Sequence, residues 1–186
     1  MSYIPCELHC HTIHSDGDFT VSELQKAAAD DHLAIIALTD HNTFSGWDEL
    51  DDNIIPAIRG IEWTTYFGHM LVLGANDFVD WRDAQPDNID EKIKQVKAVG
   101  GIVGIAHPYQ LGSPLCTGGR WEFNVRDWRN VDYIEVWHQN LYSAKRENER
   151  ALELWTSLLD KGYKIAATYG RDWHREETSG HYGCTY

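Results

Sequence analysis

The sequence predicts an α/β protein built around a mainly parallel β-sheet, and three observations support this prediction. Continuous apolar runs of strand length alternate along the chain with segments of helical character, which is the order that crossover helices between parallel strands produce. Six of the predicted strands end at, or just before, a histidine, aspartate or glutamate. Since sites in α/β folds gather at the carboxyl ends of strands, six such ends converging on one mouth favour a closed barrel over an open, doubly wound sheet.

The predicted strands are apolar runs that lack a helical repeat. A continuous run that follows a helix is typical of a strand buried on both faces, as in a parallel sheet. We expect strands over residues 4–8, 33–38, 54–61, 102–106, 131–137 and 164–168. Residues 63–74 are expected to form an extended pair, because Gly68 and His69 mark a turn between two strand-like halves.

The predicted helices carry an apolar stripe and recognisable end signals. We expect them over residues 20–32, 45–52, 89–99 and 144–161. Thr20 can cap the first helix, and Glu23 completes a capping box. Gly100 and Gly162 are placed to end the last two helices. The glycine- and proline-rich stretch over residues 109–120 is expected to be a long loop beside the site.

Length and composition indicate one globular domain over residues 1–186, with 42% hydrophobic residues to supply a core. The net charge of −13 is unfavourable for binding duplex nucleic acid, which needs a basic surface. Divalent cations in a cleft would offset part of that charge locally. The tail over residues 182–186 is similar to the opening of a further strand, so either the barrel closes with few residues to spare or the native chain extends past Tyr186.

The four cysteines argue against a disulfide scaffold. Cys6, Cys10, Cys116 and Cys184 show no C-x-x-C spacing and form no dense framework. No apolar stretch approaches the length of a membrane span, and the N-terminus shows no basic and apolar leader. We therefore expect a cytoplasmic protein without a membrane partner.

A pair of histidines on the first strand is the first indication of a metal site. Side chains on a strand alternate between its faces, so His9 and His11 point the same way and can bind one ion. Asp16 follows after a turn and offers a hard oxygen ligand. A lone His-x-His pair is a weak signal, because a solvent-facing strand end rich in histidine looks the same.

The other strand ends turn this weak signal into a strong one. Pooled, the ends supply six histidines and three carboxylates: His9, His11, Asp16, His41, Glu62, His107, His138, Asp172 and His174. Since a mononuclear catalytic zinc site needs three protein ligands, nine ligands indicate two or three divalent ions. Mixed imidazole and carboxylate ligation suits Zn, Mn or Fe better than Mg or Ca, and open multinuclear sites of this kind serve hydrolysis.

Four short motifs resemble those of a known family, the polymerase and histidinol phosphatase (PHP) domain. They are His9-x-His11-Thr12 followed by Ser15-Asp16-Gly17, Thr39-Asp40-His41-Asn42, Ala106-His107-Pro108 and Gly170-x-Asp172-x-His174. They stand in the family's order and span nearly the whole chain. The resemblance implies a distorted seven-stranded β/α barrel, similar to a TIM barrel, with a trinuclear metal site.

The resemblance also implies which residues hold each ion. One ion would be held by His9, His11, Glu62 and Asp172, a second by Glu62, His107 and His138, and a third by Asp16, His41 and His174. Glu62 would bridge the first pair of ions, with a bridging hydroxide as the nucleophile. Trp63-Thr64-Thr65 and Asp80-Trp81-Arg82 are more similar to the subgroup that includes carbaryl-hydrolysing esterases.

Three further residues are candidates for catalysis or substrate contact. His69 follows the Gly68 turn and is expected to be a general acid or a hydrogen-bond partner of a metal ligand. Arg120 is a candidate for phosphate capture, since arginine can bind phosphate through two parallel hydrogen bonds, although a surface arginine looks the same. Arg171 stands where a small residue is common in the family, and it either reaches a substrate anion or pairs with an acidic neighbour.

Together these observations predict a metal-dependent phosphoesterase that cleaves a small phosphate ester, such as a nucleotide or a sugar phosphate. One alternative is a carboxylic or carbamic ester hydrolase on the same site. A basic cluster at the mouth would favour the phosphate ester, and an apolar mouth the carboxylic ester. The other alternative is a non-catalytic metal-binding accessory domain, against which the complete set of nine ligands argues. The sequence does not predict the oligomeric state.

Overall fold

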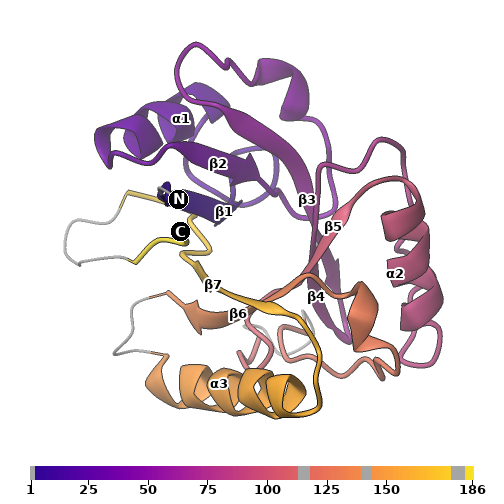
Figure 1. Ribbon diagram of the computed structural model, residues 1–186. Coiled ribbons are helices and arrows are strands. Elements are labelled where there is room, and N and C mark those ends of the chain that lie inside the picture. The colour runs from indigo at the N-terminus through magenta and orange to yellow at the C-terminus, as the bar shows by residue number, and fades with distance from the viewer. Residues whose placement is uncertain (1–2, 113–117, 140–143, 177–182) are drawn as a thin grey trace.

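The computed structural model describes residues 3–112, 118–139, 144–176 and 183–186, which leaves Cys116 and Tyr182 outside the described residues. Seven strands form one sheet in the order of the chain (Figure 1). They are β1 (Cys6–Cys10), β2 (Ile35–Leu38), β3 (Ala57–Thr65), β4 (Gly68–Leu73), β5 (Ile102–Ile105), β6 (Tyr133–His138) and β7 (Ala166–Gly170). The predicted α/β class and the seven-stranded sheet are confirmed.

The sheet is mainly parallel and nearly closes on itself. Strands β1, β2 and β3 run parallel, as do β5, β6 and β7, and β4 is antiparallel to both of its neighbours. Across the remaining gap, Trp173 after β7 forms a parallel bridge to Cys10 of β1. Thr185 forms an antiparallel bridge to Cys6, so the last residues of the chain also lie at this junction.

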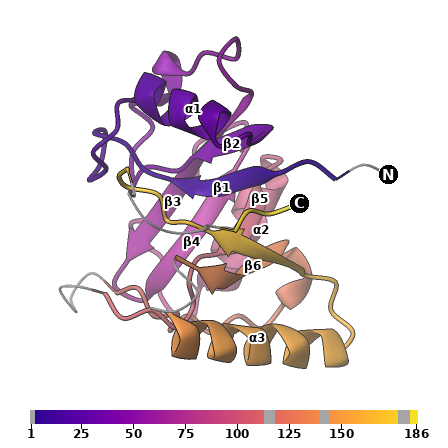
Figure 2. The same cartoon turned by 90° about the vertical axis from the view of Figure 1, so that its left-hand side faces the viewer.

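Three helices lie outside the sheet: α1 (Val21–Asp30), α2 (Ile89–Ala98) and α3 (Lys145–Asp160). Helix α1 lies beside β1 and β2, α2 beside β5, and α3 along β6 (Figures 1 and 2). Thr20 caps α1, and the predicted capping box with Glu23 is present. The helix predicted over residues 45–52 is only a 3₁₀ turn at Trp47–Glu49. Among the described residues, no helix combines the length and apolar character that a membrane span requires.

The outer face of the sheet carries most of the apolar core. A large cluster that includes Ile93, Val96 and Leu158 packs α2 and α3 against the sheet, and a second cluster that includes Leu24 and Ile36 packs α1. Because apolar burial scales with area, these two layers are the main source of stability for the barrel.

The register of the strands identifies the inner face. Glu62 pairs with Leu71, Leu71 with Gly104, and Gly104 with Tyr133, so these residues share one face of the sheet. A Cβ atom on Gly104 would lie 2.0 Å from Cζ of Tyr133, which shows that the tyrosine ring fills the space a side chain would need. Together with Ala37 and neighbouring residues, Leu71 and Tyr133 form a small apolar cluster.

The position of Glu62 corrects one sequence-based expectation. We expected the strand over residues 54–61 to end before Glu62, but β3 continues to Thr65. The reason is the antiparallel hairpin, because β4 pairs with β3 along its whole second half, from Gly60 to Thr65. Glu62 nevertheless lies level with the end of β2, where His41 forms a parallel bridge to it.

Candidate metal centre

The structure brings all nine predicted ligands together at one end of the barrel. His9 and His138 lie on β1 and β6, and Glu62 lies within β3. The other six follow strands or their loops: His11, Asp16, His41, His107, Asp172 and His174. Their imidazole rings lie close together: His11 and His174 stack with ring centroids 4.0 Å apart, and the tilted rings of His41 and His174 have centroids 5.8 Å apart.

Glu62 lies at the centre of this cluster and is fully buried. Its carboxylate lies within 3.4 Å of an imidazole nitrogen of each of five histidines: His9, His11, His41, His69 and His107. Oε2 faces the first three and Oε1 the last two. A carboxylate placed in this way can contribute one oxygen to each of two ion sites.

The first candidate ion site consists of His9, His11, Glu62 and Asp172, the same four residues that the resemblance implies. Nε2 of His11 lies 3.1 Å from Asp172 Oδ1 and 3.4 Å from Glu62 Oε2. Nε2 of His9 lies 3.3 Å from Glu62 Oε2. Four ligand atoms therefore converge on one point from β1, from β3 and from the segment after β7.

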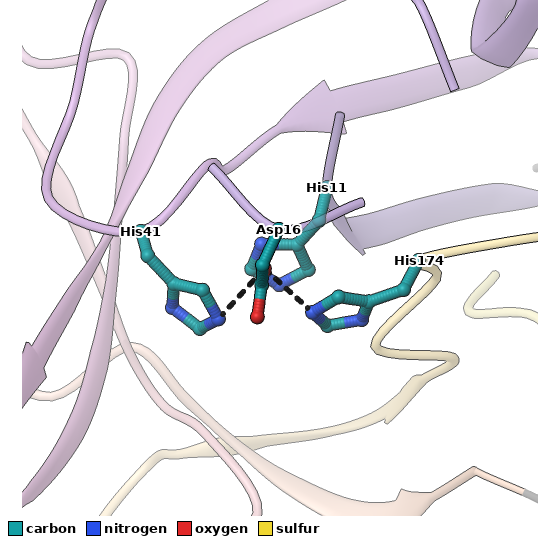
Figure 3. Close-up of side chains that lie close together, drawn as sticks. All are labelled: His11, Asp16, His41 and His174. Atoms are coloured by element: carbon teal, nitrogen blue, oxygen red, sulfur yellow. Dashed lines mark ion pairs between the residues drawn. The ribbon is translucent and has the colours of Figure 1, made fainter. Parts of the chain in front are cut away.

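A second candidate site lies nearer the solvent and consists of His11, Asp16, His41 and His174 (Figure 3). Asp16 Oδ1 lies 3.4 Å from Nε2 of His41 and 3.1 Å from Nε2 of His174. The set matches the one that the resemblance implies, with His11 added. Asp16 is the most exposed of these ligands, with a side chain that is 61% exposed.

The third candidate site differs from the implied set. Glu62 Oε1 lies 2.9 Å from Nδ1 of His69 and 3.1 Å from Nε2 of His107, and these three residues form a potential ion site. His138 belongs to none of the potential ion sites among the described residues, and its Nε2 lies 3.9 Å from Asp172 Oδ2. In the structure, His69 rather than His138 completes this set with Glu62 and His107.

The buried polar atoms of the cluster test whether it fits metal ions. Atoms without a hydrogen-bond partner among the described residues include Nε2 of His9, both ring nitrogens of His11, Oε2 of Glu62, Nδ1 of His107, both ring nitrogens of His138 and Oδ1 of Asp172. Burying polar atoms without partners is costly, so a cluster of them needs compensation. Divalent cations would satisfy these atoms, and a mixed imidazole and carboxylate donor set suits Zn, Mn or Fe.

The pKa shifts of the cluster favour the metal-binding form of some ligands and oppose it in others. Burial acts to raise the pKa of Glu62, but His9 and hydrogen bonds from surrounding imidazoles outweigh burial and hold that pKa well below its usual value. Burial lowers the pKa of His11 to about 4, and burial together with His107 lowers the pKa of His138 to about 3. Burial acts to lower the pKa values of His9, His41 and His107, but nearby carboxylates, Glu62 among them, outweigh burial and raise those pKa values. Since neutral imidazoles and ionised carboxylates are the forms that bind metals, an ion would displace protons from these three histidines.

The backbone around the site adopts unusual conformations. Among the described non-glycine residues, five have positive φ angles, and four of these lie in or beside the motifs: Asn42, His107, Gln139 and Asp172. Such conformations cost free energy and persist where the surrounding structure enforces them, often at functional sites.

Two supporting residues, one of them at a strand end and one within a helix, fix the segments that carry predicted ligands. Asp40 accepts hydrogen bonds from the Thr12 backbone N–H at 2.7 Å, from the Thr12 hydroxyl at 2.8 Å and from the Ser15 hydroxyl at 2.8 Å. It therefore fixes the loop that presents Asp16. Asn148 of α3 accepts a hydrogen bond from the backbone N–H of His138 and donates one to its backbone carbonyl. An asparagine within a helix gives little sign of this role, because most exposed helix faces carry such residues.

A cavity of about 530 Å³ opens over the ion sites, within the range of small-molecule pockets. It is lined by Ser15, Asp16, His41, Asn42, Thr64, His69, His107, Gln110, Leu111, Gly112, Gly119, Asp172 and His174. Apart from the predicted ligands and His69, the polar lining residues are uncharged. Among the described lining residues there is no lysine or arginine, so the described part of the mouth carries no basic cluster.

The two predicted arginines lie away from the described cavity lining. Arg120 is exposed, and only its neighbour Gly119 lines the cavity. The guanidinium of Arg171 lies 2.5 Å from Asp31 Oδ2 and 3.8 Å from Glu7 Oε2, and it stacks over the Trp173 ring at 4.5 Å. Arg171 thus pairs with acidic neighbours, and a contact of either arginine with substrate remains a prediction.

We expect Arg171→Gln to lower the free energy of unfolding by about 1–3 kcal/mol, because a side chain that is only 10% exposed loses its hydrogen bond to Asp31 and its contact with the buried Glu7. The Michaelis constant for any hydrolysed substrate should stay within about twofold. Urea unfolding and steady-state kinetics would measure the two effects. Arg129→Gln is the matched control, since Arg129 pairs with Asp127 but is 79% exposed, and it should leave the free energy of unfolding close to that of the wild type. A large rise in the Michaelis constant with unchanged stability would place Arg171 at the substrate.

Comparisons with known proteins agree with the fold. The model of the PHP domain family matches residues 7–103. That stretch is more than half of the chain, and the chain belongs to the PHP domain family.

Two uncharacterised proteins of Methanocaldococcus jannaschii are related in sequence. One is 28% identical over 109 residues, which are 59% of this chain and 48% of that protein, so the match spans about half of its length. The other is 29% identical over 150 residues, which are 72% of this chain and 83% of that protein.

Three solved structures share the fold. A candidate metal-dependent phosphoesterase from Bifidobacterium adolescentis gives a TM-score of 0.66 at 20% identity and covers 98% of this chain and 94% of its own. A two-domain Bacteroides vulgatus protein with a predicted PHP-like metal-dependent phosphoesterase gives a TM-score of 0.67 at 21% identity. The match covers 92% of this chain and 52% of that protein. An amidohydrolase from Chromobacterium violaceum, with bound sulfate and no metal, gives a TM-score of 0.61 at 18% identity. The match covers 92% of this chain and 88% of that protein.

Proposed function

We propose that this protein is a metal-dependent phosphoesterase that holds two or three divalent ions, Zn, Mn or Fe. The observation that carries the proposal is the buried Glu62 carboxylate, which presents one oxygen to the His9, His11 and Asp172 set and the other to His69 and His107. A carboxylate shared between two sets of imidazoles suits a site with more than one ion, and multinuclear sites are typical of phosphoester hydrolysis.

The nine predicted ligands would hold the ions, and His69 would add a tenth donor. Bound divalent ions supply Lewis acidity and activate water as a nucleophile near neutral pH. Burial lowers the pKa values of His11 and His138 and so favours the neutral, metal-binding form of these two ligands. His69, which lies beside the cavity and 2.9 Å from Glu62, is also placed to act as a general acid if it is not a ligand.

We infer that the substrate is a small phosphate ester, such as a nucleotide or a sugar phosphate. The cavity of about 530 Å³ has room for one such molecule, and the net charge of −13 disfavours a polyanionic polymer. Uncharged side chains such as Asn42, Thr64 and Gln110 can form hydrogen bonds with hydroxyl groups of the leaving alcohol. The charge on the phosphate would be met by the ions.

One observation favours a second candidate, a carboxylic or carbamic ester hydrolase. Phosphate sites commonly use arginine or lysine, and the described lining of the cavity contains neither. Leu111, which is 63% exposed, adds an apolar group to the mouth. The fold does not separate the two candidates, because fold neighbours include proteins described as phosphoesterases and as an amidohydrolase.

The test is the metal content of protein purified without chelator, with assays of a generic aryl phosphate and an aryl carboxylic ester. We expect two or three ions per chain and phosphate release that is lost in Asp172→Ala. Asp18→Ala is the control, since Asp18 lies in the first loop but outside every ligand set. Hydrolysis of the carboxylic ester alone would support the second candidate. A protein that binds no ion and stays inactive with added Mn or Zn would contradict both.

A further inference from the structure

The barrel interior holds a buried carboxylate to which the family resemblance assigns no ion, although with His9 and His107 it forms a fourth group of potential ligands. Glu135 lies on β6, two residues after Tyr133 and on the same inner face, and it is 1% exposed. Its Oε1 lies 2.8 Å from Nδ1 of His9. Its Oε2 accepts a hydrogen bond from the backbone N–H of His107 at 3.0 Å. One carboxylate thus contacts two predicted metal ligands that come from opposite sides of the barrel.

The bond to Glu135 determines which nitrogen of His9 is available to an ion. A carboxylate has no proton to donate, so Nδ1 of His9 carries the proton in this bond. In the neutral imidazole, which is the form that binds a metal, Nε2 then keeps its lone pair. It has no hydrogen-bond partner among the described residues, and it faces Glu62 Oε2 at 3.3 Å and Asp172 Oδ1 at 3.4 Å. The free lone pair therefore points at the first candidate ion site.

Gly170 on β7 provides the space that the Glu135 carboxylate occupies. A Cβ atom on Gly170 would lie 2.1 Å from Glu135 Oε1, far closer than a real contact. Gly170 is not among the glycines with positive φ, so its backbone would accept alanine. Gly170→Ala therefore displaces the carboxylate without changing any polar group of the site.

We propose that Glu135 is a positioning residue, which fixes the tautomer and orientation of His9 and the backbone of His107 for metal binding. The inference rests on the proposed function, because it requires His9 to hold an ion. Carboxylates that bind the second nitrogen of a metal-ligating histidine orient the ring and raise its basicity, and their loss typically costs roughly 10–100-fold in metal affinity.

The first experiment measures Zn²⁺ affinity by competition with a chromophoric chelator, for the wild type, Glu135→Gln, Glu135→Ala and Gly170→Ala. We expect all three variants to bind roughly 10–100-fold more weakly. Glu7→Gln is the matched control, since Glu7 is equally buried and its Oε1 accepts only backbone N–H groups, of His9 and Arg171. It should bind within about threefold of the wild type. Circular dichroism and thermal unfolding of the metal-free proteins establish that each variant folds.

A double-mutant cycle separates positioning from general damage to the core. If Gly170→Ala acts by displacing Glu135, it should have little further effect on Zn²⁺ affinity once Glu135 is alanine. Additive losses in the double variant would overturn this link. In ¹⁵N-histidine NMR spectra, a slowly exchanging imidazole N–H signal should be present in the wild type and Glu7→Gln and absent in Glu135→Ala and His9→Gln.

The outcomes distinguish this inference from the proposed function. A wild type that binds no Zn²⁺ would overturn both. A wild type that binds Zn²⁺, with Glu135 variants of equal affinity, would overturn the positioning role alone. One ion fewer per chain in Glu135→Gln at saturating Zn²⁺ would also overturn it, because Glu135 would then be a ligand.

Discussion

Glu62→Gln is expected to lower kcat/KM by at least about a thousandfold and to reduce the number of ions bound per chain. The reason is the position of Glu62, whose two oxygens face separate sets of imidazoles and whose loss affects both. Removing a single preorganised hydrogen-bond donor from an active site costs on the order of 10²–10³ in rate, and a bridging metal ligand should cost more. The measurements are steady-state kinetics on the preferred aryl substrate and elemental analysis after gel filtration.

The control for this substitution is Glu7→Gln, which changes an equally buried carboxylate on the inner face of β1. Glu7 lies outside every candidate ligand set. Burial, the largest influence, raises the pKa of Glu7 to about 8, so its carboxyl group is mostly protonated at neutral pH and resembles an amide. The control should keep full ion content and nearly full activity. A Glu62→Gln protein that keeps both as well would refute the central role of Glu62.

The ligands could be predicted from the sequence because each is encoded locally. A histidine at the end of an apolar run lies at the mouth of a barrel whatever the exact pairing of strands, so His41, His107 and His174 needed only the run and its end. The family motifs then supplied the grouping. This reasoning does not depend on the precise start of a strand, and β1 begins two residues later than expected without moving His9 or His11 from the site.

The supporting contacts could not be predicted in the same way because they depend on pairings across the sheet. Glu135 contacts His9 from 126 positions away, and no local pattern links the two. A signal was nevertheless present, since a glutamate between Ile134 and Val136 in a buried strand is rarely left without a partner. The same holds for Arg171, whose pairing with Asp31 spans 140 positions. Sequence spacing alone leaves open whether such an arginine faces the substrate or the scaffold.

Removing the metal ions is expected to lower the thermal midpoint substantially. The cluster buries several polar atoms without partners among the described residues, and bound ions would satisfy them only in the folded state. An ion present at 100 times its dissociation constant stabilises a protein by about 2.7 kcal/mol. For a chain of this size, 1 kcal/mol corresponds to roughly 2–4 °C, so each ion should raise the midpoint by roughly 5–11 °C. Thermal unfolding after treatment with EDTA, followed by titration with Zn²⁺ or Mn²⁺, measures this gain.

Asp16→Ala should lose only the part of this metal-dependent rise in thermal midpoint that comes from the second candidate site, formed by His11, Asp16, His41 and His174. Asp16 bonds to His41 and His174, takes no part in the other candidate sites, and is 61% exposed, so its removal should leave the metal-free protein nearly as stable as the wild type. The metal-loaded midpoint should fall by about the contribution of one ion, with the remaining ions retained. Asp18→Ala, two residues along the same loop, should behave like the wild type. If EDTA leaves the wild-type midpoint unchanged, the cluster does not bind ions that stabilise the fold. The buried imidazole and carboxylate atoms must then be satisfied by groups other than metal ions.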